Sequence, residues 1–145
     1  MSDIQQFVSG KAMAVVGVSA AGKGFGNYAY GELKKRGFSL LAVHPTAGTI
    51  QGDPCFPRLA DLPEKVERLL VVVKPERAED VVREAAAAGI RHVWLQQGAE
   101  SPAAVKLGEA AGLNVVTGQC ILMFTDPVGG FHKFHRFVWK ILGKA

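Results

Sequence analysis

Cysteine is scarce in this chain, and so are the features that export or anchor a protein. The two cysteines, Cys55 and Cys120, form no CxxC pair and no cluster with metal-ligand spacing. The first residues, MSDIQQFVSGKAM, lack the basic start and the apolar run of a signal peptide. No stretch of about 18 or more apolar residues is present to span a bilayer. These absences predict a cytoplasmic protein with reduced thiols and no membrane insertion.

An excess of acidic residues is also absent. Lys and Arg number 17 against 13 Asp and Glu, which gives a net charge of +4, and residues 131–145 contain no acid at all. This balance favours an anionic partner, and both a polyphosphate cofactor and nucleic acid would fit it. The body of the chain has no basic run interleaved with aromatic residues, so we expect no nucleic-acid binding.

What the chain does have is a regular alternation of short apolar runs and helical segments. The runs are continuous and rich in valine and leucine, which is typical of strands buried on both faces of a parallel sheet. Strands are expected over residues 12–18, 38–45, 68–75, 91–98 and 113–118, and helices over 26–36, 75–89 and 100–112.

This alternation predicts a single Rossmann-like α/β domain over residues 1–145. We expect a doubly wound sheet of about five parallel strands, with the first strand central and helices on both faces. The segment 46–67 is less regular, and we expect there a loop and a short helix near Leu59–Leu62.

A glycine-rich stretch, GVSAAGKGFGN, follows the first predicted strand at residues 17–27. Glycines let the backbone turn sharply and approach a ligand, and the next helix offers unpaired N–H groups with a partial positive charge. Ser19 adds a hydroxyl donor and Lys23 adds a full charge. A purely structural turn would need only one or two glycines, so we favour a phosphate-binding loop over that alternative.

Two familiar kinds of phosphate site fit this stretch poorly. The spacing from Gly17 to Lys23 matches most of a P-loop, but Gly24 replaces the Ser or Thr that would hold magnesium. The third strand also ends without a Walker-B aspartate. The glycine spacing differs from the dinucleotide fingerprint, and the second strand ends at His44-Pro45 without the acid that binds a ribose. The sequence therefore predicts a phosphate site without the accessories of ATP hydrolysis or of nicotinamide binding.

Five segments, taken in order, resemble the CoA-binding domain family, which also supplies the amino-terminal domain of the succinyl-CoA synthetase α subunit. They are the loop 17–26, the strand ends 43–45 and 71–75, the run 94–98, and the segment 112–116 with Cys120. The resemblance covers most of residues 10–123 and implies that the chain binds coenzyme A or an acyl-CoA.

The resemblance also implies which residues bind the cofactor. Those of the loop would hold the phosphates, those after the second strand would line the adenosine side, those after the third strand would flank the adenine or the pantetheine arm, and those after the fourth would border the far side. In that order they are Gly17, Val18, Ser19, Lys23 and Gly26; Val43, His44 and Pro45; Val73, Lys74 and Pro75; and Gln97 and Gly98.

The chain departs from the family pattern in two ways. Ala47 stands where the synthetase has a lysine after the second-strand proline, which leaves a 3′-phosphate contact to Lys23 or Lys74. The catalytic phosphohistidine of the synthetase lies in a second domain that we do not expect here. Our leading hypothesis is therefore a CoA-binding protein without catalysis of its own. The alternative is a small enzyme acting on an acyl-CoA or another adenine nucleotide through Cys120 or His44, although the apolar residues after Cys120 favour an inert thiol.

The last segment, residues 130–142, predicts a basic amphipathic helix. Aromatic and aliphatic residues share one face of the helical wheel, and Lys and Arg share the other. We expect this helix to dock on the domain, on a second copy of the chain, or on a partner protein, in preference to an anionic membrane. His132 and His135 have no further ligands nearby, so no metal site is predicted.

Overall fold

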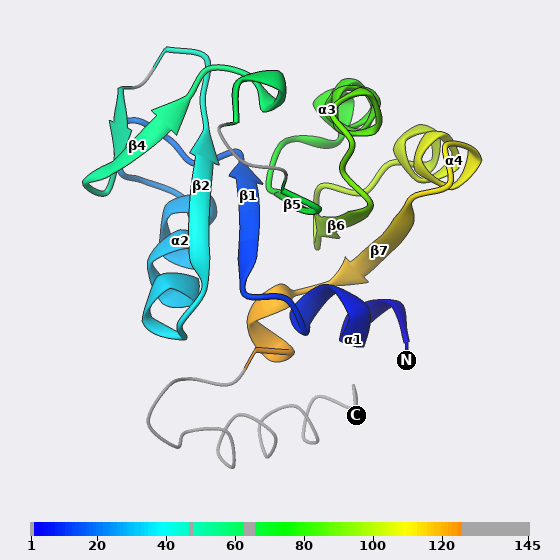
Figure 1. Cartoon of the computed structure of the whole chain (residues 1–145), viewed down its shortest axis with the longest axis horizontal. Helices are drawn as coiled ribbons and strands as arrows, with labels where there is room; N and C mark the ends of the chain where they lie inside the picture. Colours follow the sequence, from blue (N-terminus) through cyan, green and yellow to red (C-terminus); the bar gives the residue numbers. More distant parts are fainter. Residues whose placement is uncertain (1, 47, 63–65, 126–145) are drawn as a thin grey trace.

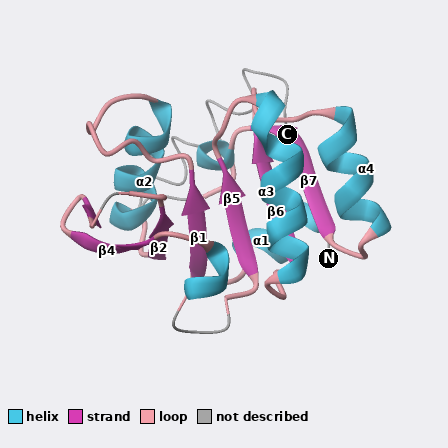
Figure 2. Cartoon of the chain, turned by 90° about the horizontal axis from the view of Figure 1, so that it is seen from above, coloured by secondary structure: helices cyan, strands magenta, loops and turns pink. Residues whose placement is uncertain are grey.

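The computed structural model describes residues 2–46, 48–62 and 66–125. Within them lies a seven-stranded sheet with the strand order β3-β4-β2-β1-β5-β6-β7. The strands are β1 (Ala12–Val16), β2 (Ser39–Val43), β3 (Thr49–Ile50), β4 (Asp53–Phe56), β5 (Arg68–Val71), β6 (His92–Gln96) and β7 (Asn114–Gln119). Every neighbouring pair is parallel except β3 and β4, and Figure 2 shows β1 and β5 pointing the same way. The predicted doubly wound α/β fold, with its first strand central, is confirmed.

Helices cover both faces of this sheet (Figure 1). They are α1 (Asp3–Val8), α2 (Phe25–Lys35), α3 (Pro75–Ala87) and α4 (Pro102–Ala110), with the short 3-10 helices η1 (Leu59–Asp61) and η2 (Ile121–Met123). The apolar sides of α1, α2 and η2 pack on one face, while α3, α4 and η1 pack on the other. Within the described part of the chain, no helix combines the length and the apolar character needed to cross a bilayer.

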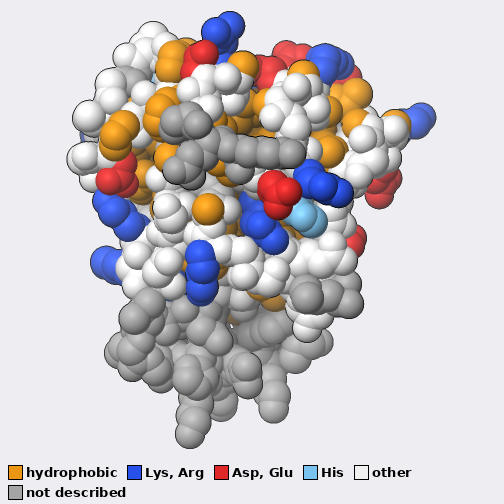
Figure 3. All heavy atoms as spheres, in the orientation of Figure 1, with side chains coloured by type: hydrophobic (Ala, Val, Ile, Leu, Met, Phe, Trp, Pro, Cys, Tyr) orange, Lys and Arg blue, Asp and Glu red, His pale blue; other side chains and the backbone are white. Residues whose placement is uncertain are grey.

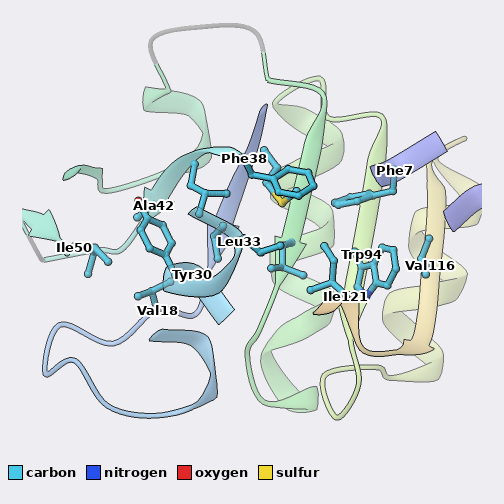
Figure 4. Packing of buried hydrophobic residues seen from close by; sticks show 14 residues of the cluster. Phe7, Val18, Tyr30, Leu33, Phe38, Ala42, Ile50, Trp94, Val116 and Ile121 are labelled. Carbon is cyan, nitrogen blue, oxygen red and sulfur yellow. The ribbon is translucent and has the colours of Figure 1, made fainter. Parts of the chain in front are cut away.

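Successive residues of the central strands enter different cores. Met13 and Val15 of β1 point to the face covered by α2, whereas Ala14 points to the face covered by α3. Figure 4 shows the first of these cores, in which Phe7 of α1 meets Trp94 of β6 edge to face with ring centroids 5.4 Å apart. Because both faces of the central strands are buried, their sequences read as continuous apolar runs.

Two parts of the fold differ from what the sequence predicts. The segment 46–67 contains the expected short helix, as η1, but it also forms β3 and β4, which extend the sheet beyond β2. β3 has two residues and β4 has four, which include Asp53 and Pro54. Their sequences therefore lack the continuous apolar run that is typical of a buried strand. Helix α1 was also not expected, and it is stabilised by a capping box in which Ser2 and Gln5 bond to each other's backbone. The predicted helix over 130–142 lies outside the described residues.

Candidate functional site

The chain changes direction across the sheet at β1. It passes from β1 to β2 on one side and later returns to β5 on the other side. At such a reversal the loops after the two strands diverge, which leaves a crevice at their carboxyl ends. A cleft of about 370 Å³ lies at this point, between the loops that follow β1, β5 and β6. The predicted residues that it brings together are Gly17, Lys23, Gly26, Val73, Lys74, Pro75, Gln97 and Gly98.

In the lining of this cleft, three backbone segments approach too closely for any side chain to lie between them. Gly17 has a φ of 114°, and a Cβ atom on it would overlap the carbonyl group of Val72. A Cβ atom on Gly26 would lie 2.6 Å from the carbonyl oxygen of Gly17, well inside van der Waals contact. We call the meeting of Gly17, Gly26 and Val72 the backbone junction. It explains why glycine is needed at these two positions of the loop.

The loop between β1 and α2 is shaped by hydrogen bonds to Ser19. The hydroxyl oxygen of Ser19 accepts from the Ala21 N–H at 3.0 Å, and its carbonyl oxygen accepts from the Gly22 N–H at 3.2 Å. Asn27, in the first turn of α2, contacts both backbone groups of Ser19: Oδ1 accepts from the N–H at 2.8 Å and Nδ2 donates to the carbonyl oxygen at 3.0 Å. The Ser19 N–H is therefore engaged within the protein, and Ser19, although predicted as a site residue, is not among the residues that line the cleft.

The start of α2 supplies the unpaired backbone donors of the cleft. Its N-cap residue is Gly24, which has no side chain to accept from the first N–H groups. Helix α3 also begins without a side-chain cap, after Lys74. By contrast, Ser101 caps α4 by accepting from the Ala104 N–H at 3.0 Å. The two helices whose N-termini line the cleft thus lack a side-chain cap, and both direct a positive dipole end toward it. The free N–H donors belong mainly to α2, because Pro75 at the start of α3 has no N–H and the Arg77 N–H donates to the Lys74 carbonyl oxygen at 2.9 Å.

Two lysines add positive charge to the same cleft. Lys23 and Lys74 are exposed, and neither forms an ion pair with any other residue that the structure describes. On the opposite wall the backbone donors are engaged, because Gly98 donates its N–H to the Glu100 carboxylate at 3.0 Å and Gln97 donates to a carbonyl of β7 at 3.2 Å. An anion would therefore find its donors on the α2 side of the cleft.

The remaining predicted residues lie apart from the cleft. Val18 and Val43 are only 2% and 8% exposed, and their side chains belong to the two hydrophobic cores. His44 and Pro45 follow β2 outside the cleft lining. The His44 N–H donates to a carbonyl of β4 at 2.9 Å, and its Nδ1 accepts from the Thr46 N–H at 3.1 Å. The side chain of His44 thus closes a local turn at the end of its strand.

The two residues of the enzyme alternative are not brought together. His44 follows β2 and Cys120 follows β7, with β1, β5 and β6 between them, a span of roughly 19 Å at the usual strand spacing. The other thiol, Cys55, lies nearer to His44, with its Sγ 4.0 Å from the His44 carbonyl oxygen, and burial raises its pKa. Among the residues with a described position, no group of three or more His, Cys, Asp and Glu could hold a metal ion.

A larger hollow of about 850 Å³ lies at the amino-terminal end of the sheet. Its polar lining includes Glu67, Arg91, His92 and Asn114. Burial, and then the charge of Arg68, lower the pKa of His92. Its Nδ1 lies 3.2 Å from the Asn114 Nδ2 and accepts from it in the neutral tautomer that carries the proton on Nε2. The ends of α3 and α4 border this hollow, and helix C-termini disfavour an anion. The carboxyl-end cleft is therefore the stronger candidate for a phosphate ligand.

This chain is similar to part of a longer curated ligase and to the whole of a short protein of known structure. An ADP-forming acetate–CoA ligase I of Archaeoglobus fulgidus is 24% identical over 136 residues, which are 87% of this chain and 20% of the ligase. The chain thus spans about a fifth of the length of that curated relative. A conserved hypothetical protein from Pyrococcus furiosus matches with a TM-score of 0.76 and 34% identity, over 80% of this chain and 100% of that one.

A third match extends the likeness in fold. The dinucleotide-forming acetyl-coenzyme A synthetase 1 of Ca. Korarchaeum cryptofilum, solved with phosphate and ADP, has a TM-score of 0.69 and 24% identity, over 79% of this chain and 27% of that one. The family model described as CoA binding domain matches residues 11–126, which include every segment that lines the cleft. The predicted family is confirmed: the chain belongs to the CoA-binding domain family.

Proposed function

We propose that this chain binds coenzyme A, or an acyl-CoA, with the cofactor's pyrophosphate on the uncapped start of α2. The observation that carries the proposal is the set of free backbone donors beginning at Gly24, beside the exposed charge of Lys23, in the cleft of a CoA-binding domain. The backbone junction supports it, since glycine at positions 17 and 26 keeps side chains away from the donors. The residues present therefore fit a pyrophosphate group.

Other parts of the cleft suit the rest of the cofactor. Val73 and Pro75 offer apolar surface to the pantetheine arm, and Phe25, which lines the cleft and is 43% exposed, faces them from α2. Lys74 supplies a charge for the 3′-phosphate. His44, at the end of β2, borders the adenosine side from outside the cleft lining. Gln97 and Gly98 close the far wall.

The proposal is one of binding without a reaction. The polar side chains of the cleft are lysines and glutamines, which do not form a nucleophile with an adjacent base. The name of the Archaeoglobus fulgidus relative assigns it a ligase activity, and we propose that the part it shares with this chain supplies the CoA site. We propose a cytoplasmic location, where CoA would be available. Docking of a second copy or a partner through residues 130–142 remains a prediction.

Isothermal titration calorimetry with CoA, dephospho-CoA, ATP and NAD tests the proposal directly. We expect CoA to bind most tightly, and dephospho-CoA to bind more weakly if Lys74 contacts the 3′-phosphate. Long incubation should leave acyl-CoA unchanged, as judged by mass spectrometry. Preference for NAD, or no measurable affinity for CoA, would exclude the proposed function.

Lys23→Ala tests the position of the pyrophosphate. The substitution removes one charge-assisted hydrogen bond, so we expect the affinity for CoA to fall by about 1–2 kcal/mol. Lys35→Ala is the matched control, because Lys35 carries the same charge on the last turn of α2 with its side chain 77% exposed. Calorimetry should show an unchanged dissociation constant for the control. Equal affinities in the two variants would place the pyrophosphate elsewhere.

A further inference from the structure

Asn27 is a polar side chain buried where the loop after β1 meets α2. It is 7% exposed and lies in the first turn of the helix. Its amide contacts both backbone groups of Ser19, at 2.8 Å and 3.0 Å, as a neighbouring strand would. The opposite orientation of the amide would set NH₂ against N–H and oxygen against carbonyl oxygen, so the partners themselves fix which atom is which.

Few other contacts hold this loop in place. Residues 20–24 are exposed, and Gly22 and Gly24 have φ values of 77° and 97°. A Cβ atom added at either glycine would have no other atom within 4 Å. The remaining hydrogen bonds that we find in the loop run from Ala21 and Gly22 to Ser19 itself. The path of the loop toward α2 therefore depends on where Ser19 is held, and Asn27 holds it.

Asn27 is itself supported from the edge of the sheet. Gln51, in the turn between β3 and β4, donates from Nε2 to the carbonyl oxygen of Asn27 at 2.8 Å. Gln51 is the one non-glycine residue with positive φ, 49°, in the described part of the chain. Such a conformation is uncommon outside glycine, asparagine and aspartate, and from it the Gln51 side chain reaches the Asn27 carbonyl oxygen. The contact thus connects the β3–β4 turn to the ligand loop through a single residue.

We propose that Asn27 is the positioning residue of the ligand site: it fixes Ser19, and through it the loop, so that the donors from Lys23 to Gly26 face one phosphate group. This inference rests on the proposed function, because it assumes that a phosphate of CoA binds there. Asn27 does not touch the ligand. Both of its polar groups are used within the protein, and their effect on affinity is to keep the loop in its binding conformation before the ligand arrives.

Asn27→Ala removes both hydrogen bonds without adding charge. We expect its affinity for CoA to fall about tenfold or more, since two buried bonds are lost and Ser19 is left unpaired. Hydrogen exchange without ligand should become faster at residues 19–24 while the strands keep their protection. If the wild type binds CoA and a folded Asn27→Ala variant binds it with the same affinity, this inference is overturned and the proposed function stays intact. Failure of the wild type to bind CoA would overturn both.

Asn27→Asp gives a second measurement, which serves even if the alanine variant does not fold. The ionised carboxylate accepts from the Ser19 N–H but cannot donate to the Ser19 carbonyl, whereas the protonated acid does both. Because the site is buried and faces the Ser19 carbonyl oxygen, we expect the pKa of the introduced carboxyl group to lie above the ordinary aspartic acid value of about 3.9. The ratio of variant to wild-type dissociation constants for CoA should then decrease from pH 8 to pH 5. Asn114→Asp makes the same change at the amino-terminal end of the sheet and should leave the affinity unaltered. A ratio for Asn27→Asp that is near one at pH 8, where the carboxylate cannot donate to the Ser19 carbonyl oxygen, would contradict the positioning role.

Discussion

Gly26 and Gly31 lie on the same helix, α2, but in different surroundings. A Cβ atom on Gly26 meets the carbonyl oxygen of Gly17 at 2.6 Å, a backbone atom that cannot move without disturbing β1. A Cβ atom on Gly31 would lie 3.4 Å from the Gln51 side-chain oxygen, at the lower limit of ordinary van der Waals contact and away from any backbone atom of another element. The same substitution should therefore have opposite effects at the two positions.

Gly26→Ala should lower the free energy of unfolding by about 1–3 kcal/mol, because the added methyl group forces the backbone junction apart. It should also weaken CoA binding. Gly31→Ala should raise the free energy of unfolding by about 0.5–1 kcal/mol, since alanine is the better helix former. Urea unfolding of both variants at pH 7 measures these changes. A neutral or stabilising Gly26→Ala would mean that the junction can open.

At the level of single residues, the sequence predicts the kind of site better than the way it is held. Gly17, Lys23 and Gly26 could be assigned to one site because a glycine-rich loop after the first strand of a parallel sheet lies where ligands bind, and all three do line the cleft; their contact with a phosphate remains a proposal. Asn27 could not be found in the same way. It bonds to Ser19 only because the loop folds back on itself, and no spacing rule links the two positions. Val18 and Val43, which lie in two of the predicted buried strands, are buried in the cores and do not line the cleft.

Among the elements, the β3–β4 pair is fastened to α2 by its side chains. Asp53 of β4 accepts from the Tyr30 hydroxyl at 2.8 Å and pairs with the Lys34 ammonium group at 2.9 Å. The hydrogen bond from Lys34, and then the one from Tyr30, lower the pKa of Asp53. Burial, and then the bond to Asp53, raise the pKa of Tyr30. The ion pair therefore joins β4, which follows the turn that contains Gln51, to α2, which contains Asn27.

Asp53→Asn should remove this contribution and its dependence on pH. The folded-state pKa of Asp53 is below the unfolded one, so the stabilisation is complete above the unfolded value of about 3.9 and is lost as the pH falls through the folded value. We expect the free energy of unfolding at pH 7 to decrease by about 1 kcal/mol, and the difference from wild type to shrink at pH 3. Urea unfolding at the two pH values measures this.

Asp80→Asn is the control for this experiment. Asp80 pairs with Arg83 on the surface of α3, where its side chain is 81% exposed, so its removal should change stability little at either pH. A similar loss in both variants would show that Asp53 acts as a surface charge and not as the fastening of the β3–β4 pair.

The elements that the sequence misses are those whose stability comes from such contacts. β1, β2, β5, β6 and β7 are recognisable because burial on both faces leaves an apolar run. β3 and β4 are short, contain Pro54, and depend on Asp53 reaching α2. Helix α1 is also short, and its position depends on Arg68, which donates to the carbonyl oxygen of Phe7 at 2.8 Å.

For the whole molecule, the cleft draws its walls from chain segments far apart in sequence. On the face shown in Figure 3, basic side chains are dispersed, with acidic ones between them, so charge on that face is not gathered into one surface. Within the cleft itself, positive charge comes from Lys23 and Lys74. Because its walls follow β1, β5 and β6, a bound ligand would stabilise the sheet as a unit.

CoA should therefore raise the thermal unfolding midpoint in a single cooperative transition. At a free ligand concentration of 100 times the dissociation constant, linkage predicts about 2.7 kcal/mol of added stability. Differential scanning calorimetry over a series of CoA concentrations measures this shift, and Lys23→Ala should need proportionately more ligand for the same shift. A midpoint that stays constant despite binding would indicate that the ligand does not favour the folded state.

The backbone junction also limits how proteins built this way can change their ligand. Main-chain atoms are the same whatever the sequence, and at Gly17 and Gly26 a larger residue has no room. This part of the cleft lining is therefore chemically fixed. A change in ligand preference, from one acyl group to another or between nucleotides, would therefore have to come from other residues that line the cleft, such as Phe25, Lys74 and Gln97. Randomising those positions while keeping the two glycines would therefore be the most direct way to change which ligand the proposed site binds.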